Sequence, residues 1–137
     1  MAMIGLTIGG VAWFAYPGER AMPFGVGTEQ ADPYYVYVID GDTFDYRGTR
    51  IRVADIDTPE MRGRCDYEIR LAARATARMR VLLSQGPFEL HPLASGRDED
   101  RYGRKLRIVT RNGRSLGDQL VAEGLARTWT GRREPWC

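Results

Sequence analysis

Three short segments of the sequence combine carboxylates, arginines and turn residues in a way that suits phosphate-ester chemistry. They are Asp40-Gly-Asp42-Thr43, Arg52-Val-Ala-Asp-Ile-Asp57-Thr-Pro-Glu60 and Asp100-Arg-Tyr-Gly-Arg104. Hard divalent cations take oxygen ligands, and an arginine adds a planar, permanently charged fork that fits a phosphoryl group. Together the segments predict a site that holds a divalent cation against a phosphodiester.

Asp42 and Asp57 can share one ion only if the chain between them folds back. Residues rich in β-branched and aromatic side chains, separated by turns at Asp40-Gly41 and Arg47-Gly48, predict three strands at 34–39, 43–46 and 49–54. Asp42 begins the second strand and Asp57 lies just past the third, so the hairpin returns both to the same end. We therefore expect the two carboxylates to lie within reach of one metal ion.

A long helix is predicted over residues 66–85. Asp66 can cap its start and Gly86 can stop it. Apolar residues recur at helical spacing and form a core stripe: Ile69, Ala72, Ala75, Met79, Leu82 and Leu83. Arg70, Arg74 and Arg78 lie on another face, which we interpret as solvent-exposed.

Two further strands and a short helix complete the pattern. Strands are predicted at 88–93 and 105–110, and Ser115-Leu-Gly-Asp118 resembles a capping box that opens a helix ending at Gly124. The predicted fold class is α+β, mainly β. Its architecture is a five-stranded OB-fold barrel with a helix inserted between strands 3 and 4 and a short C-terminal helix.

The amino-acid composition is typical of one compact domain that binds an anionic polymer. The 137 residues are 43% hydrophobic, which is enough for a real core. Residues 1–60 hold four Arg against nine Asp/Glu, whereas residues 61–137 hold sixteen Lys/Arg against nine Asp/Glu. This asymmetry fits an anionic substrate that also needs a metal, although a solvated surface of mixed sign has the same composition.

The residue inventory argues against several other classes of site. The two cysteines form no CxxC or Cys/His cluster, which argues against zinc. Pro59 would fall inside an EF-hand loop, which excludes that motif. His91 is the only histidine and lies in a predicted strand, so neither a Ser/His mechanism nor a His-metal mechanism is available.

The two ends of the sequence bear on domain organisation and location. Residues 1–16 are uncharged and apolar, typical of an export signal or a membrane anchor, with a buried or disordered N-terminus as the alternative. We assign residues 1–33 to an N-terminal region, which consists of this apolar segment and a linker from Gly18 to Pro33. Residues 34–137 are assigned to the folded domain. Cys65 and Cys137 either form one disulfide, which requires an oxidising compartment, or are two unrelated thiols. We expect an extracytoplasmic protein, secreted or membrane-anchored.

The three segments, in this order, resemble the staphylococcal nuclease (thermonuclease) family. Leu120-Val-Ala-Glu-Gly-Leu-Ala126 is also similar to a helix of that family, and the resemblance covers residues 35–129. It implies an OB-fold barrel and a nuclease that uses one calcium ion to cleave DNA and RNA endonucleolytically, leaving 3′-phosphates. We expect a monomer.

The resemblance also implies a role for each matching residue of the metal centre. Asp42 and Asp57 match the two metal-binding carboxylates, and Thr58 matches the residue whose carbonyl binds the same ion. Glu60 matches the carboxylate that positions or deprotonates the attacking water.

The basic residues match groups that contact phosphate. Arg52 and Arg104 correspond to the two arginines at the phosphoryl group undergoing reaction. Arg101 and Tyr102 correspond to a basic residue and a tyrosine near a terminal phosphate.

The chain departs from the family pattern after Glu60, where residues 61–65 form a short basic loop. Arg62 and Arg64 there could grip the substrate backbone, or Cys65 could tie the loop to the tail. Trp129 and Trp136 are candidates for stacking on a base, with packing as the alternative. The alternative function is a catalytically silent nucleic-acid-binding OB-fold domain. Retention of every matching carboxylate and arginine favours an enzyme.

Overall fold

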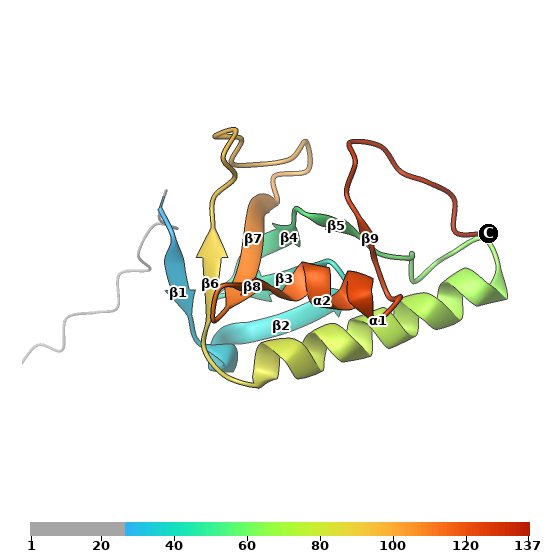
Figure 1. The fold of residues 1–137 in the computed structure, drawn as a ribbon, viewed down its shortest axis with the longest axis horizontal. Coiled ribbons are helices and arrows are strands. Elements are labelled where there is room, and N and C mark those ends of the chain that lie inside the picture. Colours follow the sequence, from blue (N-terminus) through green and yellow to red (C-terminus); the bar gives the residue numbers. More distant parts are fainter. Residues whose placement is uncertain (1–26) are drawn as a thin grey trace, which may run out of the picture.

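The computed structural model describes residues 27–137, so the apolar segment 1–16 lies outside the described residues (Figure 1). The helical segments are the 3-10 turn η1 (Pro33–Tyr35) and the α-helices α1 (Asp66–Ser84) and α2 (Leu116–Ala122). The strands are β1 (Glu29–Ala31), β2 (Val36–Asp40), β3 (Thr43–Tyr46), β4 (Thr49–Val53), β5 (Ile56–Asp57), β6 (Phe88–His91), β7 (Lys105–Arg111), β8 (Arg114–Ser115) and β9 (Arg127–Thr128). The fold is α+β with strands predominating, which confirms the predicted class.

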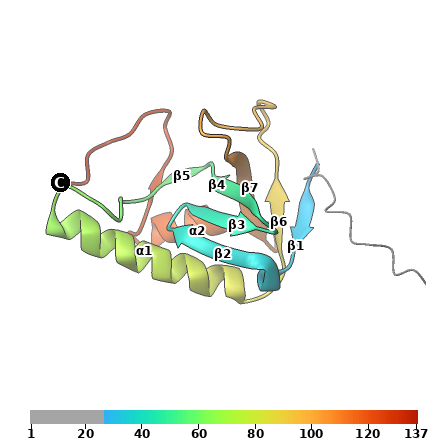
Figure 2. The ribbon, with the colours of Figure 1, turned by 180° about the vertical axis from the view of Figure 1, so that it is seen from behind.

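Seven of these strands form a curled sheet in the order β1-β6-β7-β4-β3-β2, with β8 attached to β7, and β5 and β9 form a separate two-stranded sheet. Strands β4 and β7 pair in parallel, whereas β1–β6, β6–β7, β3–β4 and β2–β3 are antiparallel. The edge strands β1 and β2 are separated only by residues 32–35, yet one pairs with β6 and the other with β3. Residues 29–40 therefore supply the strands at both edges of the sheet, which curls into a partly closed barrel (Figure 2).

Helix α1 packs along β2, and α2 contacts both α1 and β7 (Figures 1 and 2). The apolar core lies between the sheet and these helices. Its fully buried members include Phe44, Ile51, Ile56, Met79, Leu82, Phe88, Leu90 and Leu120. Burial of such side chains contributes about 25 cal/mol per Å² of apolar surface, which makes this core the main source of stability.

The sheet begins earlier in the chain than the sequence predicts. Assigning Glu29–Ala31 to the linker is wrong, because Ala31 is buried opposite Phe88 and these residues form β1. Residues 34 and 35, predicted as strand, lie in η1. A proline at the start of η1 and Asp32 at its cap favour this turn, and Asp32 Oδ1 accepts the Tyr34 N–H at 2.9 Å. Short strands β5, β8 and β9 were not predicted, while the other predicted strands and helices end within two residues of the observed bounds.

Two predictions about α1 are corrected. Ile69 is 42% exposed and does not belong to the core stripe, whereas Leu71 and Thr76 of α1 are buried. Asp66 is the first helical residue, and the N-cap is Cys65, which makes no side-chain capping bond.

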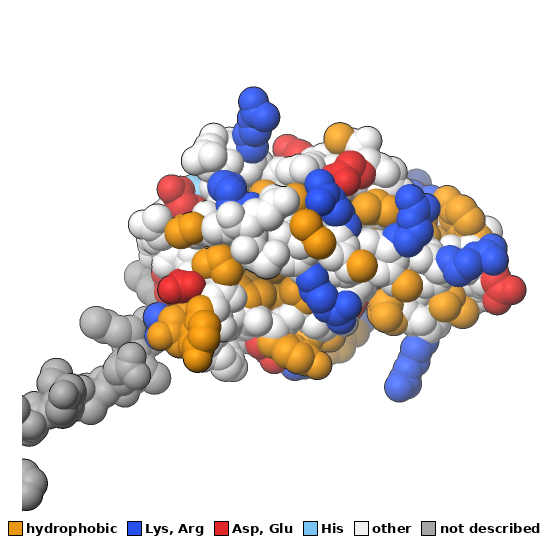
Figure 3. All heavy atoms as spheres, turned by 90° about the horizontal axis from the view of Figure 1, so that it is seen from below, with side chains coloured by type: hydrophobic (Ala, Val, Ile, Leu, Met, Phe, Trp, Pro, Cys, Tyr) orange, Lys and Arg blue, Asp and Glu red, His pale blue; other side chains and the backbone are white. Residues whose placement is uncertain are grey.

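The interpretation of Arg70, Arg74 and Arg78 as a solvent-exposed face agrees with the structure for Arg70 and Arg74, which are exposed, while Arg78 is half-buried. Figure 3 views the face below Figure 1, and its basic side chains are interspersed with apolar ones. Arg78 pairs with Glu123 at 2.7 Å. Within residues 27–137, no helix has the length and apolarity to cross a membrane.

Candidate metal and phosphate site

The two carboxylates expected at the metal lie together at one end of the sheet. Asp42 lies in the turn between β2 and β3, Asp57 ends β5, and both are buried. Nη2 of Arg52, on β4, is 3.2 Å from Asp42 Oδ2 and 3.9 Å from Asp57 Oδ1. Because one guanidinium nitrogen approaches both groups, the carboxylates lie close enough to share a cation.

Burial shapes the protonation of this cluster. Burial raises the pKa of Asp57; the guanidinium groups of Arg133 and Arg52 lower it, and the Asp42 carboxylate raises it further. Burial and the neighbouring Asp42 carboxylate also raise the pKa of Asp40 to about 7. Asp40 is a turn residue whose Oδ1 accepts the Asp42 N–H at 3.1 Å. A bound cation would favour the ionised forms of these carboxyls.

Thr58 and Gly41 fix the position of Asp42. Asp42 Oδ2 accepts the Thr58 N–H at 3.2 Å, and its Oδ1 accepts the Thr43 hydroxyl at 3.1 Å. A Cβ on Gly41 would lie 2.9 Å from both Ala75 Cβ and Thr58 Cγ2. The turn therefore passes against α1 and Thr58 at a distance that only glycine allows.

Glu60 lies in the loop between β5 and α1, where a buried carboxylate holds the backbone. Glu68 Oε2 accepts the Glu60 N–H at 3.2 Å, and Glu68 Oε1 accepts the Arg64 N–H at 3.1 Å. Sequence reasoning missed Glu68. The available signal was its place three residues after the N-cap, where a glutamate commonly reaches back to the chain entering a helix.

Arg104 lies in the loop that precedes β7 and reaches Thr43, the neighbour of Asp42 in the chain. Its Nε donates to Asp100 Oδ2 at 2.6 Å, and its Nη1 is 3.5 Å from the Thr43 hydroxyl. The ring of Tyr102 lies 5.4 Å from the Arg104 guanidinium, and Arg101 Nη2 contacts Tyr102 Oη at 2.6 Å. The residues expected to bind a terminal phosphate therefore adjoin Arg104 at an exposed edge.

The C-terminal tail, residues 129–137, contributes a residue that the sequence analysis did not assign. A disulfide joins Cys65 to Cys137, with their Cα atoms 6.2 Å apart. Arg133 Nη2 lies 3.5 Å from Asp57 Oδ1 and 3.5 Å from the Thr58 carbonyl oxygen, and it forms an ion pair with Glu60 Oε1. No local motif marks Arg133; the cysteine pair was the sequence signal that the tail could return here.

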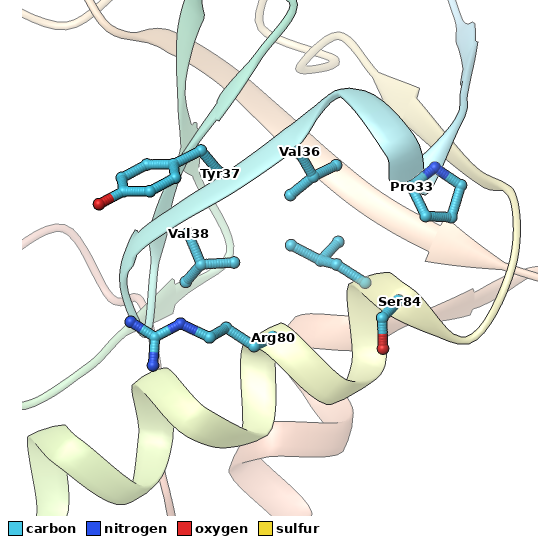
Figure 4. Close-up of a pocket in the computed structure, with 7 residues that line it drawn as sticks. Pro33, Val36, Tyr37, Val38, Arg80 and Ser84 are labelled. Carbon is cyan, nitrogen blue, oxygen red and sulfur yellow. The ribbon is translucent and has the colours of Figure 1, made fainter.

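A cavity of about 470 Å³ opens between the loop after Glu60 and this tail. Arg62 and Arg64 line it, as does Trp136. The guanidinium of Arg127 stacks 3.7 Å above the Trp136 ring, so this indole packs within the protein. A separate hollow of about 240 Å³ lies between β2 and α1, away from the predicted site residues (Figure 4).

The donor atoms at the site suit a hard cation. They are the carboxylates of Asp42 and Asp57 and the carbonyl of Thr58, and the guanidinium nitrogens of Arg52 and Arg133 already lie against them. Within the part of the chain that the structure describes, no three His, Cys, Asp or Glu residues are grouped to hold a metal. A calcium shell of 6–8 oxygens would therefore need the carbonyl and water as well.

A family model described as staphylococcal nuclease homologue matches residues 50–135, which is more than half of the chain. The chain belongs to this family. The match includes the segments that carry Arg52, Asp57, Glu60 and Arg104, and it begins after Asp42.

Three relatives of this staphylococcal nuclease homologue carry curated names. Endonuclease YncB and the SPbeta prophage-derived endonuclease YokF, both of Bacillus subtilis (strain 168), are each 34% identical over 93 residues, covering 65% of this chain and 44% and 31% of the relatives. Protein ParB of Escherichia coli is 37% identical over 104 residues, covering 66% of this chain and 53% of that protein. The chain thus spans about half or less of the length of these relatives.

Proposed function

We propose that this staphylococcal nuclease homologue is a calcium-dependent nuclease of DNA and RNA. It would cleave internal phosphodiester bonds and leave 3′-phosphates. The observation that carries the proposal is that Arg52 Nη2 lies against the buried carboxylates of Asp42 and Asp57, while Arg133 Nη2 contacts Asp57, the Thr58 carbonyl and Glu60. Family membership and the names of two relatives as endonucleases support it.

Each residue of the site has a distinct task in this mechanism. Asp42, Asp57 and Thr58 would hold one calcium ion, which supplies Lewis-acid polarisation of the phosphoryl oxygen. Arg52 and Arg104 stabilise the charge that develops on the phosphoryl oxygens. Glu60 takes the proton of the attacking water, which its half-exposed carboxylate can reach. The P–O5′ bond breaks, the departing 5′ oxygen takes up a proton from solvent and leaves as a 5′-hydroxyl, and the phosphate stays on the 3′ oxygen.

The disulfide supports a proposal about location. A link between Cys65 and Cys137 persists in oxidising compartments. We therefore propose that the protein works outside the cytoplasm, with residues 1–16 acting as an export signal or membrane attachment. We propose separately that it is a monomer.

Digestion of plasmid DNA and of RNA, in calcium, in magnesium and in chelator, tests the function. We expect cleavage of both polymers in calcium and none in chelator, with 3′-phosphate ends detected by phosphatase-dependent labelling. Asp57→Asn should abolish cleavage. Asp45→Asn is the matched control, because Asp45 is on β3 but pairs with Arg50 at 2.9 Å. Calcium-dependent binding without cleavage would contradict the proposal and favour the catalytically silent domain.

A further inference from the structure

Arg133 places a positive charge among the oxygens expected to bind calcium. A single atom, Nη2, contacts Asp57 Oδ1 and the Thr58 carbonyl, each at 3.5 Å, and pairs with Glu60 Oε1. These three oxygens lie on one short stretch of chain, which runs from the end of β5 at Asp57 into the loop that carries Thr58 and Glu60. Arg133 thus joins the proposed metal ligands to the proposed base.

The tail holds Arg133 from both sides. Before it, Arg127 on β9 is the cross-strand partner of Asp57, and its Nη1 donates to the carbonyls of Glu134 and Pro135 at 3.2 and 3.0 Å. After it, Cys137 is bonded to Cys65 at the start of α1. The guanidinium is therefore delivered by a tethered segment whose two ends are fixed to the elements that carry Asp57 and Glu60.

We propose that Arg133 is a resident cation of the site, which competes with the divalent metal for Asp57 and Thr58 and covers Glu60 until it is displaced. This inference rests on the proposed calcium site. Calcium requires its oxygens at 2.3–2.6 Å, and a guanidinium at the same oxygens repels it strongly because like charges interact over several ångströms in a partly buried site. The side chain of Arg133 must therefore move away when the metal binds.

Displacement has a consequence for Glu60. By linkage, calcium binding weakens the contact of Arg133 with Asp57 by the same free energy by which that contact weakens calcium binding. Once Arg133 leaves, the Glu60 carboxylate loses its ion-pair partner and can accept a proton from water. The tail thus makes the base available only in the metal-loaded state. It also lowers calcium affinity, and this effect depends on the disulfide that fixes the tail.

Calorimetric titration of the purified chain with calcium, without substrate, tests this inference. Arg133→Gln should bind calcium about tenfold more tightly than the natural protein, a typical size for coupling between two ligands at one site. Arg132→Gln is the matched control. It removes the same charge from the same tail, but Arg132 is 81% exposed and pairs with Glu134 at 2.8 Å. It should bind calcium as the natural protein does.

Two further variants separate the effect of the charge at position 133 from the effect of the disulfide that fixes the tail. Arg133→Lys keeps the charge and should stay near the natural affinity. The double variant Cys65→Ser/Cys137→Ser releases the tail and should shift towards the affinity of Arg133→Gln. Thermal melts in chelator establish that each variant is folded.

The outcomes distinguish this inference from the proposed function. Equal or weaker calcium binding by Arg133→Gln, while the natural protein binds calcium, would overturn the inference and leave the calcium site standing. Absence of binding in both proteins would overturn both. Calcium binding by Arg133→Gln but not by the natural protein would also support the inference, because the natural arginine would then exclude the ion completely.

Discussion

The backbone N–H of Thr58 donates a hydrogen bond of 3.2 Å to Asp42 Oδ2, and this bond joins two proposed metal ligands that lie sixteen positions apart. It explains how the turn after β2 and the end of β5 act as one site. The same contact requires Gly41, because a side chain there would strike Thr58 and α1. Backbone geometry, rather than side-chain choice alone, therefore fixes where the carboxylates meet.

Gly41→Ala should destabilise the protein and disturb the site. The added Cβ would lie 2.9 Å from Ala75 Cβ and Thr58 Cγ2, and overpacking of this kind costs about 1–3 kcal/mol. Urea denaturation in chelator measures the loss. Gly27→Ala is the control, because nothing lies within 4 Å of its added Cβ. Equal stability of the two variants would contradict the close approach.

Arg52→Gln should lower stability most when no metal is present. Arg52 lies against the buried Asp42 and Asp57, and removing one partner of a buried ion pair costs about 3 kcal/mol or more. Calcium should restore much of the loss by supplying the missing positive charge. Melting temperatures with calcium and with chelator measure this. Arg50→Gln, at an exposed pair with Asp45, should change little in either condition.

Glu60→Gln should reduce turnover by about a hundredfold or more, the usual contribution of a general base. Because the Glu60 side chain is half-exposed, the melting temperature should stay close to that of the natural protein. Initial rates of plasmid cleavage at saturating calcium measure the effect. Glu123→Gln, which alters an exposed pair with Arg78 on α1, is the control. Full turnover in Glu60→Gln would remove Glu60 from the mechanism.

Glu68→Gln should loosen the loop that carries Glu60. The carboxylate accepts two backbone N–H groups with its two oxygens, whereas an amide offers one acceptor and leaves the second N–H facing a donor. A buried unsatisfied group costs about 1–3 kcal/mol. We expect turnover to fall about tenfold as the base loses its position. Denaturation and initial rates measure the two effects, and unchanged values for both would show that Glu68 does not hold the loop.

Reduction of the Cys65–Cys137 disulfide should destabilise the protein. The bond closes a loop of 72 residues, and a loop of that size is expected to contribute about 4 kcal/mol through the entropy of the unfolded chain. Denaturation with and without reductant measures the difference, and Cys65→Ser/Cys137→Ser provides the same comparison without reductant. A decrease in the free energy of unfolding below about 1 kcal/mol would mean that the disulfide contributes little to stability.

Local sequence was enough to place β2, β3 and β4 around Asp42, whereas β5, which carries Asp57, was not predicted and forms by pairing with β9. Turn residues at Asp40-Gly41 and alternating apolar residues in β3 and β4 act through short-range backbone preferences, and the hairpin geometry follows from them. At residues 34 and 35 the missed signal was local, because Pro33 and Asp32 favour the turn there, but two other failures were decided by long-range contacts. Glu29–Ala31 became a strand because β6 pairs with it, and Ile69 left the core because the surface that α1 buries depends on β2 and α2.

The sequence by itself determined the chemical content of the site: two carboxylates, a threonine carbonyl, a glutamate and two arginines in a fixed order, each set in a segment whose local geometry is encoded by its own residues. Only the tertiary structure decided the role of Glu68 beneath the loop and of Arg133 among the proposed ligands. The contacts of Arg133 join distant segments that no local preference encodes, whereas Glu68 lies at a helix position with a local signal that does not by itself show its burial beneath the Glu60 loop. Arg133 reaches Asp57 from the far end of the chain, because a disulfide and the β5–β9 pair carry the tail there.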